Sequence, residues 1–181
     1  MRTLTFILVM SAIATIAAAQ EKKTEKTSPA AVTDSMTNID AVPDVYTMGG
    51  RFERVHVLRL KYKTDLLAGI EKGIRESGVL NGVILAGTGS VMSYHYHVVS
   101  NMNFPTKNIF IRNPSAPADL VGMNGYVING RVHAHASFTD AEKAFGGHLE
   151  PGTTVFTFAL ITIGMLSDTT DLNRTDDKNY R

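Results

Sequence analysis

Two short segments of the sequence carry the side chains best suited to hold a metal ion. One is the His-Ala-His motif at 133–135, and the other is the Gly-Gly-His motif at 146–148. Side chains two positions apart on a β-strand lie on one face, so the imidazoles of His133 and His135 can reach the same ion. A loop can bring His148 back to them, and the glycines allow close approach of the backbones. The spacing therefore predicts a metal site made of three imidazoles.

Three neutral imidazoles are a typical donor set for Zn²⁺, with a fourth position left open for water. The sequence has no cysteine, which excludes thiolate ligands and disulfides. Ca²⁺ and Mg²⁺ prefer oxygen ligands, so zinc, or another divalent ion that accepts nitrogen, is the expected cofactor. The alternative interpretation of the His-Ala-His motif is a partly exposed polar strand face that binds no metal.

Further titratable residues extend the candidate site. His95 and His97 repeat the spacing on another expected strand, where they either add a ligand or form a surface or subunit contact. A fourth histidine ligand would leave no open position for water. If the ion activates water, Glu142 and Glu150 are the candidate general bases. His56 stands alone and is predicted to be structural, and no catalytic residue can be singled out.

The first 19 residues have the pattern of a secretory signal peptide. Arg2 is followed by an uncharged run that ends in three alanines at 17–19, the small-residue pattern that signal peptidase recognises. The alternative is an uncleaved membrane anchor, but the run is rich in Ala, Ser and Thr. We expect cleavage after Ala19, export to the periplasm or the extracellular space, and no stable membrane insertion afterwards.

The charge of the mature chain argues against a nucleic-acid partner. The full sequence has 18 Lys and Arg and 17 Asp and Glu, so removal of Arg2 with the signal peptide leaves the two signs equal. Proteins that bind DNA usually carry a clustered positive excess, because contacts with phosphates supply much of their affinity. We therefore expect that the exported form does not bind DNA.

The length and composition predict one domain with flanking segments. The chain has 181 residues, of which 44% are hydrophobic and 19% charged, as in soluble globular proteins. Residues 20–43 show neither helical nor strand periodicity and are predicted to be a disordered linker. Residues 168–181 are predicted to be a polar, solvated tail. The folded domain is therefore expected at 44–167.

Strand patterns dominate that domain. Asn129-Gly130 between two β-forming runs favours a type I′ hairpin, because both residues of that turn take positive φ. The run at 153–165 is apolar on both faces, which predicts a central strand covered on both sides. The polar stretch 139–147 is interpreted as a connection. The other expected elements are strands at 52–60, 79–87, 91–99 and 107–112 and one amphipathic helix at 64–76.

At these motifs the sequence resembles the plants and prokaryotes conserved (PPC) domain. The resemblance covers roughly 48–166, and it is carried by the segments at 50–53, 87–91, 130–135, 145–149 and 151–152. It implies a single compact α/β domain of the α+β type, with a largely antiparallel sheet and one main helix, that assembles as a homotrimer. It also implies that His133, His135 and His148 bind a metal, usually taken as zinc.

Two other features of that family transfer poorly to this sequence. The family is commonly labelled as DNA-binding because plant members join the domain to AT-hook segments, but no Arg-Gly-Arg-Pro hook occurs here. In the plant proteins the segment matching Gly50, Arg51, Phe52 and Glu53 belongs to a partner-binding motif. Here Arg54 follows it where an apolar residue is usual, so the segment departs from that motif at the position after Glu53.

Three function hypotheses remain open. The first is an exported metal-binding protein with a binding or sensing role, whose ligand could be a small molecule between subunits. The second is a zinc-dependent hydrolase or lyase, and the third is DNA binding, as the family label says.

A cupin is the alternative fold, but cupins place a Glu soon after the His-x-His pair, whereas the nearest carboxylates here are Asp140 and Glu142.

Overall fold

The computed structural model describes residues 20–27, 44–103, 105–167 and 169–175. Strands and one α-helix make up most of this part of the chain, and every strand pairing in it is antiparallel. The structure therefore confirms an α+β domain with an antiparallel sheet and one main helix. The elements are β1 (Lys22–Thr27), β2 (Phe52–Lys61), α1 (Leu66–Ser77), β3 (Gly82–Val99), β4 (Lys107–Asn113), β5 (Ala118–Ile128), β6 (Arg131–Thr139), β7 (Ala144–Leu149), β8 (Thr154–Leu166) and the 3₁₀-helix η2 (Leu172–Thr175).

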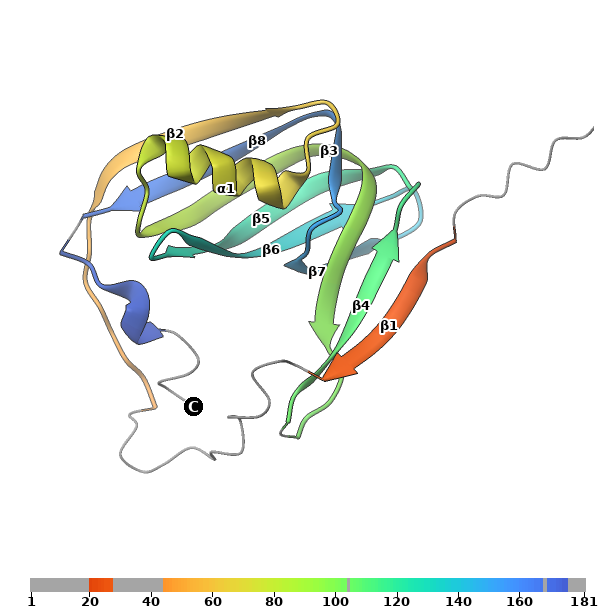
Figure 1. Cartoon of the computed structure of the whole chain (residues 1–181), viewed down its shortest axis with the longest axis horizontal. Coiled ribbons are helices and arrows are strands. Elements are labelled where there is room, and N and C mark those ends of the chain that lie inside the picture. Colours follow the sequence, from red (N-terminus) through yellow and green to blue (C-terminus); the bar gives the residue numbers. More distant parts are fainter. Residues whose placement is uncertain (1–19, 28–43, 104, 168, 176–181) are drawn as a thin grey trace, which may run out of the picture.

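Helix α1 forms where its sequence predicts it, and it covers one face of the sheet (Figure 1). It begins after Asp65, whose Oδ1 accepts a hydrogen bond from the Ala68 N–H at 3.0 Å, and it ends at Gly78 in the left-handed conformation. The buried side chains of the helix recur four positions apart and pack into the core with β8 and the end of β2. They are Leu66, Ile70 and Ile74.

Strand β3 is the long central strand of the sheet, and it corrects the expectation of two strands at 79–87 and 91–99. The register with β8 shifts near Gly89, which has φ +152°. A bulge here bends the strand without ending it. The bend lets β3 change partners, since its first half pairs with β5 and β8 and its second half with β4 and β7 (Figure 1).

Strand β8 lies between β2 and β3, as its apolar sequence predicts, but the prediction that both of its faces are covered is wrong. Val155, Ala159 and Ile161 are buried on the face toward α1. On the opposite face Phe156 and Phe158 are 46% and 40% exposed. The sheet therefore has one closed face and one open, partly apolar face.

The hairpin between β5 and β6 is confirmed, and β7 is a strand that the sequence interpretation did not include. Asn129 and Gly130 have φ of 50° and 73°, the positive values that a type I′ turn requires. The polar stretch 139–147 was expected to be a connection, but its last residues belong to β7. This strand pairs with β6 on one side and with the second half of β3 on the other, so β3, β5, β6 and β7 close into a ring of pairings.

The flanking segments are more ordered than the sequence suggests. Within the expected linker, β1 pairs with the edge of β4, and the Tyr94 hydroxyl donates to Glu21 Oε2 at 2.7 Å. In the expected solvated tail, η2 buries Leu172. The predictions of disorder at 22–27 and of a solvated chain at Leu172 are therefore wrong. The predicted signal peptide at 1–19 and the linker residues 28–43 lie outside the described residues.

None of the helices in the described part of the chain combines the length and the apolar character needed to cross a lipid bilayer.

Asp65 joins α1 to the turn before β8, because its Oδ2 also accepts the Gly152 N–H at 2.6 Å. We expect Asp65→Ala to lower the free energy of unfolding by about 1–3 kcal/mol, since a helix cap and a second hydrogen bond are both lost. Urea denaturation measures this. The control is Glu76→Ala, which removes only an exposed ion pair with Lys72. Equal stability of the two variants would contradict this role of Asp65.

Candidate metal centre

Strand β6 presents two histidines on the open face of the sheet. His133 and His135 are exposed, whereas Ala134 and Ala136 between and after them are buried at 2% exposure. This is the alternation that the His-Ala-His spacing predicts. The short alanine side chains pack inward, so both imidazoles remain outside and on the same side of the strand.

The register of β7 brings a third histidine beside this pair. His148 is the direct cross-strand partner of His135 on β6 and of His97 on β3. Directly opposed residues of antiparallel strands present their side chains on one face. The three strands therefore form a row of imidazoles across the sheet, and His133 lies two positions from His135 along β6.

Two glycines make this register possible. Gly146 and Gly147 have φ of +158° and +159°. A Cβ atom on Gly147 would collide with the backbone oxygen of His97, and one on Gly146 would collide with that of Ala136. The Gly-Gly pair thus lets β7 fit between β3 and β6, as close backbone approach requires.

The three predicted ligands converge in the structure. One ligand nitrogen from each of His133, His135 and His148 lies within 4.8 Å of the other two. Nitrogens around a tetrahedral zinc ion are about 3.4 Å apart, which follows from Zn–N bonds of about 2.0–2.1 Å. Small side-chain rotations would bring the nitrogens from within 4.8 Å of one another to the spacing around zinc. Two of the three rings are exposed, so they have room to rotate. The residues present fit a divalent ion with nitrogen ligands.

Burial and neighbouring imidazoles favour the neutral form of His135 and His148. Burial, followed by the charges of His97, His133 and His135, lowers the pKa of His148 to about 4. Burial first, and then His133 and His97, also lowers the pKa of His135. A histidine must be neutral to bind a metal. At neutral pH these two residues are therefore ready to act as ligands.

His97 and Glu150 form a second group that shares His148. The Nδ1 atom of His97 lies 2.6 Å from Glu150 Oε1, and its ring stacks on that of His148 with centroids 4.5 Å apart. Ligand atoms of His97, His148 and Glu150 also lie within 4.8 Å of one another. A carboxylate that fixes an imidazole in this way is a common neighbour of metal ligands. Of the two candidate general bases, Glu150 is the one in contact with the cluster.

The remaining predicted site residues contribute no ligand atom to either group. His95 bonds through Nδ1 to the Pro151 carbonyl at 2.7 Å and belongs to neither group. Glu142 lies in the turn between β6 and β7, on the order of 20 Å from His148 along the extended strand. His56 is on β2, where its Nε2 is buried with no hydrogen-bond partner among the described residues. The segment 50–53 leads into β2, and its Gly50 lines a cavity that His133 and His148 also line, whereas its role in partner binding stays a prediction.

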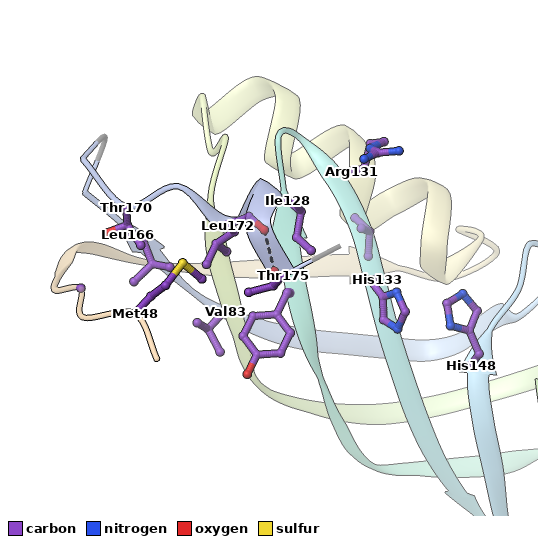
Figure 2. Close-up of a pocket in the computed structure, with 13 residues that line it drawn as sticks. Met48, Val83, Ile128, Arg131, His133, His148, Leu166, Thr170, Leu172 and Thr175 are labelled. Atoms are coloured by element: carbon purple, nitrogen blue, oxygen red, sulfur yellow. Dashed lines mark hydrogen bonds between the residues drawn. The ribbon is translucent and has the colours of Figure 1, made fainter. Parts of the chain in front are cut away.

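A cavity of about 760 Å³ adjoins the cluster, and His133 and His148 form part of its wall (Figure 2). Met48, before β2, and Leu172, in η2, contribute to other parts of the wall. The sequence interpretation missed this cavity, because it assigned Leu172 to a solvated tail. The available signal was Leu172 itself, an apolar residue in a polar segment.

The fold and the site together define a class of protein: a single α+β domain whose antiparallel sheet carries a three-histidine cluster on two neighbouring strands. The chain belongs to the Plants and Prokaryotes Conserved (PCC) domain family, whose model matches residues 48–167. This confirms the resemblance seen in the motifs of the sequence.

Three solved structures share the fold. A plant- and prokaryote-conserved (PPC) protein from Pyrococcus horikoshii has a TM-score of 0.60 and 21% identity, covering 75% of this chain and 94% of its own. The metal-containing protein of Archaeoglobus fulgidus has a TM-score of 0.56 and 22% identity, covering 68% and 86%. A candidate DNA-binding protein from Bacteroides thetaiotaomicron has a TM-score of 0.52 and 13% identity, covering 67% and 86%. At these identities the likeness concerns the fold alone.

One curated protein is related in sequence to part of the chain. The bifunctional protein GlmU of Synechococcus sp. (strain JA-3-3Ab) is 27% identical over 111 residues, or 61% of this chain. The match spans 17% of the length of that protein. The similarity is therefore to one segment of a much longer chain.

The glycine pair can be tested directly. We expect Gly147→Ala to lower the free energy of unfolding by about 2 kcal/mol or more and to disturb the histidine row, because the new Cβ would collide with the His97 backbone. Gly122→Ala is the matched control, since the nearest atom to its Cβ would lie 3.9 Å away. Chemical denaturation and the ¹H–¹⁵N spectra of the imidazoles measure both effects. A Gly147 variant that behaves like the Gly122 variant would refute this account of the register.

The low pKa of His148 predicts a pH-dependent stability of the metal-free protein. The unfolded imidazole has a pKa of about 6.5, whereas the folded value is about 4. Between these values the unfolded chain binds a proton that the folded chain does not, so the free energy of unfolding falls as pH is lowered through this range. We expect a smaller slope for His148→Gln in denaturation experiments with chelator present. An unchanged slope would show that His148 does not cause the effect.

Proposed function

We propose that this protein binds one divalent metal ion per chain through His133, His135 and His148, and that it acts as an exported, homotrimeric binding or sensing protein. The observation that carries the proposal is the convergence of three imidazole nitrogens within 4.8 Å on one face of the sheet. His97 stacks on His148 and is the candidate for an additional ligand. His95, which bonds to the main chain, is the weaker candidate.

Zinc is the ion that best fits this donor set. Zn²⁺ accepts three imidazoles in a tetrahedral arrangement, whereas Ca²⁺ and Mg²⁺ prefer oxygen ligands. The lowered pKa values of His135 and His148 keep both rings neutral at neutral pH. One neighbour in fold from Archaeoglobus fulgidus is called a metal-containing protein, which agrees with a metal in this protein too.

Export and trimer formation rest on other observations. The apolar run and the three alanines at 17–19 support cleavage of a signal peptide. The open face of the sheet exposes several large apolar side chains, four of them on β2 and β8, which supports burial of this face between copies of the chain. They are Val55, Val57, Phe156 and Phe158. Family resemblance points to the same trimeric assembly.

A zinc-dependent hydrolase or lyase is the second candidate, and the contact between Glu150 and His97 is the observation that favours it. When bound, zinc would lower the pKa of a coordinated water, and Glu150 is the carboxylate near enough to the cluster to accept a proton. Glu142 does not fit this role, because it lies in the turn at the far end of β6 and β7. DNA binding receives no support from the near-neutral charge.

Metal analysis of the variants tests the proposal. We expect one zinc per chain at pH 8, with release as pH falls toward and below about 6, because protons compete for the imidazoles. Alanine at His133, His135 or His148 should abolish stoichiometric binding, whereas His56→Ala should retain it. Mass spectrometry for metals and calorimetric titration provide the measurements. The proposal fails if the triple alanine variant still holds one zinc per chain, or if the wild type holds none after purification without chelator.

A further inference from the structure

The end of β7 presents an imidazole and a carboxylate on one side of the chain. Leu149 is buried at 2% exposure, whereas His148 and Glu150 on either side of it are partly exposed. Side chains two positions apart in an extended chain share a face. The extended backbone continues through Glu150, whose N–H donates to the His95 carbonyl at 3.0 Å. The segment His148-Leu149-Glu150 therefore repeats the alternation of the His-Ala-His motif, with a carboxylate as the second ligand.

Strand β3 adds a second imidazole to this pair. His97 is the direct cross-strand partner of His148, and its Nδ1 lies 2.6 Å from Glu150 Oε1. Ligand atoms at adjacent corners of an octahedron lie about 3.0 Å apart when the bonds to the ion are about 2.1 Å long. The imidazole and the carboxylate are thus already near the spacing that a shared ion requires. One ligand atom from each of His97, His148 and Glu150 lies within 4.8 Å of the other two.

This second set of ligands differs from the three-histidine set in burial and in charge. The side chains of His97 and Glu150 are 19% and 21% exposed, whereas His133 and His135 are exposed residues. The carboxylate of Glu150 offsets part of the charge of a divalent ion, which three neutral imidazoles cannot do. A charge that is partly removed from water is favoured where an opposite charge accompanies it.

Two imidazoles and one carboxylate also favour a different ion. Carboxylate oxygen is a preferred ligand of Mn²⁺, and Fe²⁺ is commonly held by two histidines and one carboxylate with its other positions open. Three imidazoles, by contrast, are a typical donor set for zinc. The donor chemistry of the second set therefore points to an ion that accepts both nitrogen and carboxylate oxygen.

We propose that His97, His148 and Glu150 form a second divalent-metal site, which takes Mn²⁺ or Fe²⁺ and shares His148 with the zinc site proposed above. An ion here must displace the proton that joins His97 to Glu150, so it is held less tightly than zinc at the three-histidine set. Titration detects such an ion, whereas purification removes it. The inference does not depend on zinc binding, because His133 and His135 take no part in the second site.

Titration with Mn²⁺ tests the inference, since the electron paramagnetic resonance signal of the free ion is lost when the ion binds. The full chain is first freed of metal with chelator, which is then removed. We expect saturable binding of one Mn²⁺ per chain, and affinity weaker by tenfold or more in Glu150→Gln, because an amide lacks the anionic oxygen. Glu142→Gln is the matched control, since Glu142 is exposed in the turn between β6 and β7. It should bind Mn²⁺ like the wild type.

Two histidine variants separate this site from the zinc site. His97→Ala should weaken Mn²⁺ binding by tenfold or more and still retain zinc through purification. His133→Ala should lose the retained zinc and keep an Mn²⁺ affinity within about twofold of the wild type. Circular dichroism checks that each variant is folded, and His97→Ala keeps the test decisive if Glu150→Gln does not fold.

The outcomes distinguish this site from the proposed zinc function. Absence of Mn²⁺ binding by the wild type, or unchanged binding by Glu150→Gln, overturns the inference even if zinc is bound. Loss of Mn²⁺ binding in His133→Ala also overturns it, because the ion would then occupy the three-histidine set. Mn²⁺ binding that depends on Glu150, in a protein that retains no zinc, overturns the zinc proposal and supports the second site.

Discussion

The site depends on the position of β7 between β3 and β6. Antiparallel register places His148 directly opposite both His97 and His135, so a single strand aligns imidazoles from three strands. The strand can occupy that position only because Gly146 and Gly147 carry no side chains, since Cβ atoms there would collide with the backbone on either side. The ring of pairings through β3, β5, β6 and β7 then holds the row in place. Backbone geometry, more than side-chain contacts, therefore builds the cluster.

The closeness of the imidazoles in this row also affects their protonation. Several imidazoles close together cannot all carry a proton without repulsion, and partial burial adds a cost for each charge. Both effects lower the pKa of His148. The close carboxylate, Glu150, is bonded to His97, at the edge of the row. The arrangement thus favours neutral donors at its centre and holds a carboxylate at one side, which suits a divalent cation better than a protonated cluster.

Local signals in the sequence predicted the parts of the fold that depend on neighbouring residues. Asn129-Gly130 marks its hairpin, and the cap at Asp65 marks the start of α1, because both rely on contacts within a few positions. The His-Ala-His spacing likewise shows which face of β6 carries the ligands. By contrast, β7 was not predicted, because two glycines in a polar stretch indicate a loop unless the partner strands are known. The sequence of β3 alone likewise does not show that the strand continues through Gly89, because its pairing with β5 and β8 on either side maintains it.

The segment after β8 adds to the surroundings of the histidine cluster from outside the family match. Residues 48–167 match the family model and contain the whole histidine cluster. Leu172, outside that range, is nevertheless buried, and it contributes to the cavity that His133 and His148 adjoin. A change in this segment can alter the shape and polarity of the cavity without touching the ligands or the register that positions them. The histidine cluster therefore lies wholly within the family match, whereas the wall of the adjoining cavity is encoded partly within it and partly beyond it.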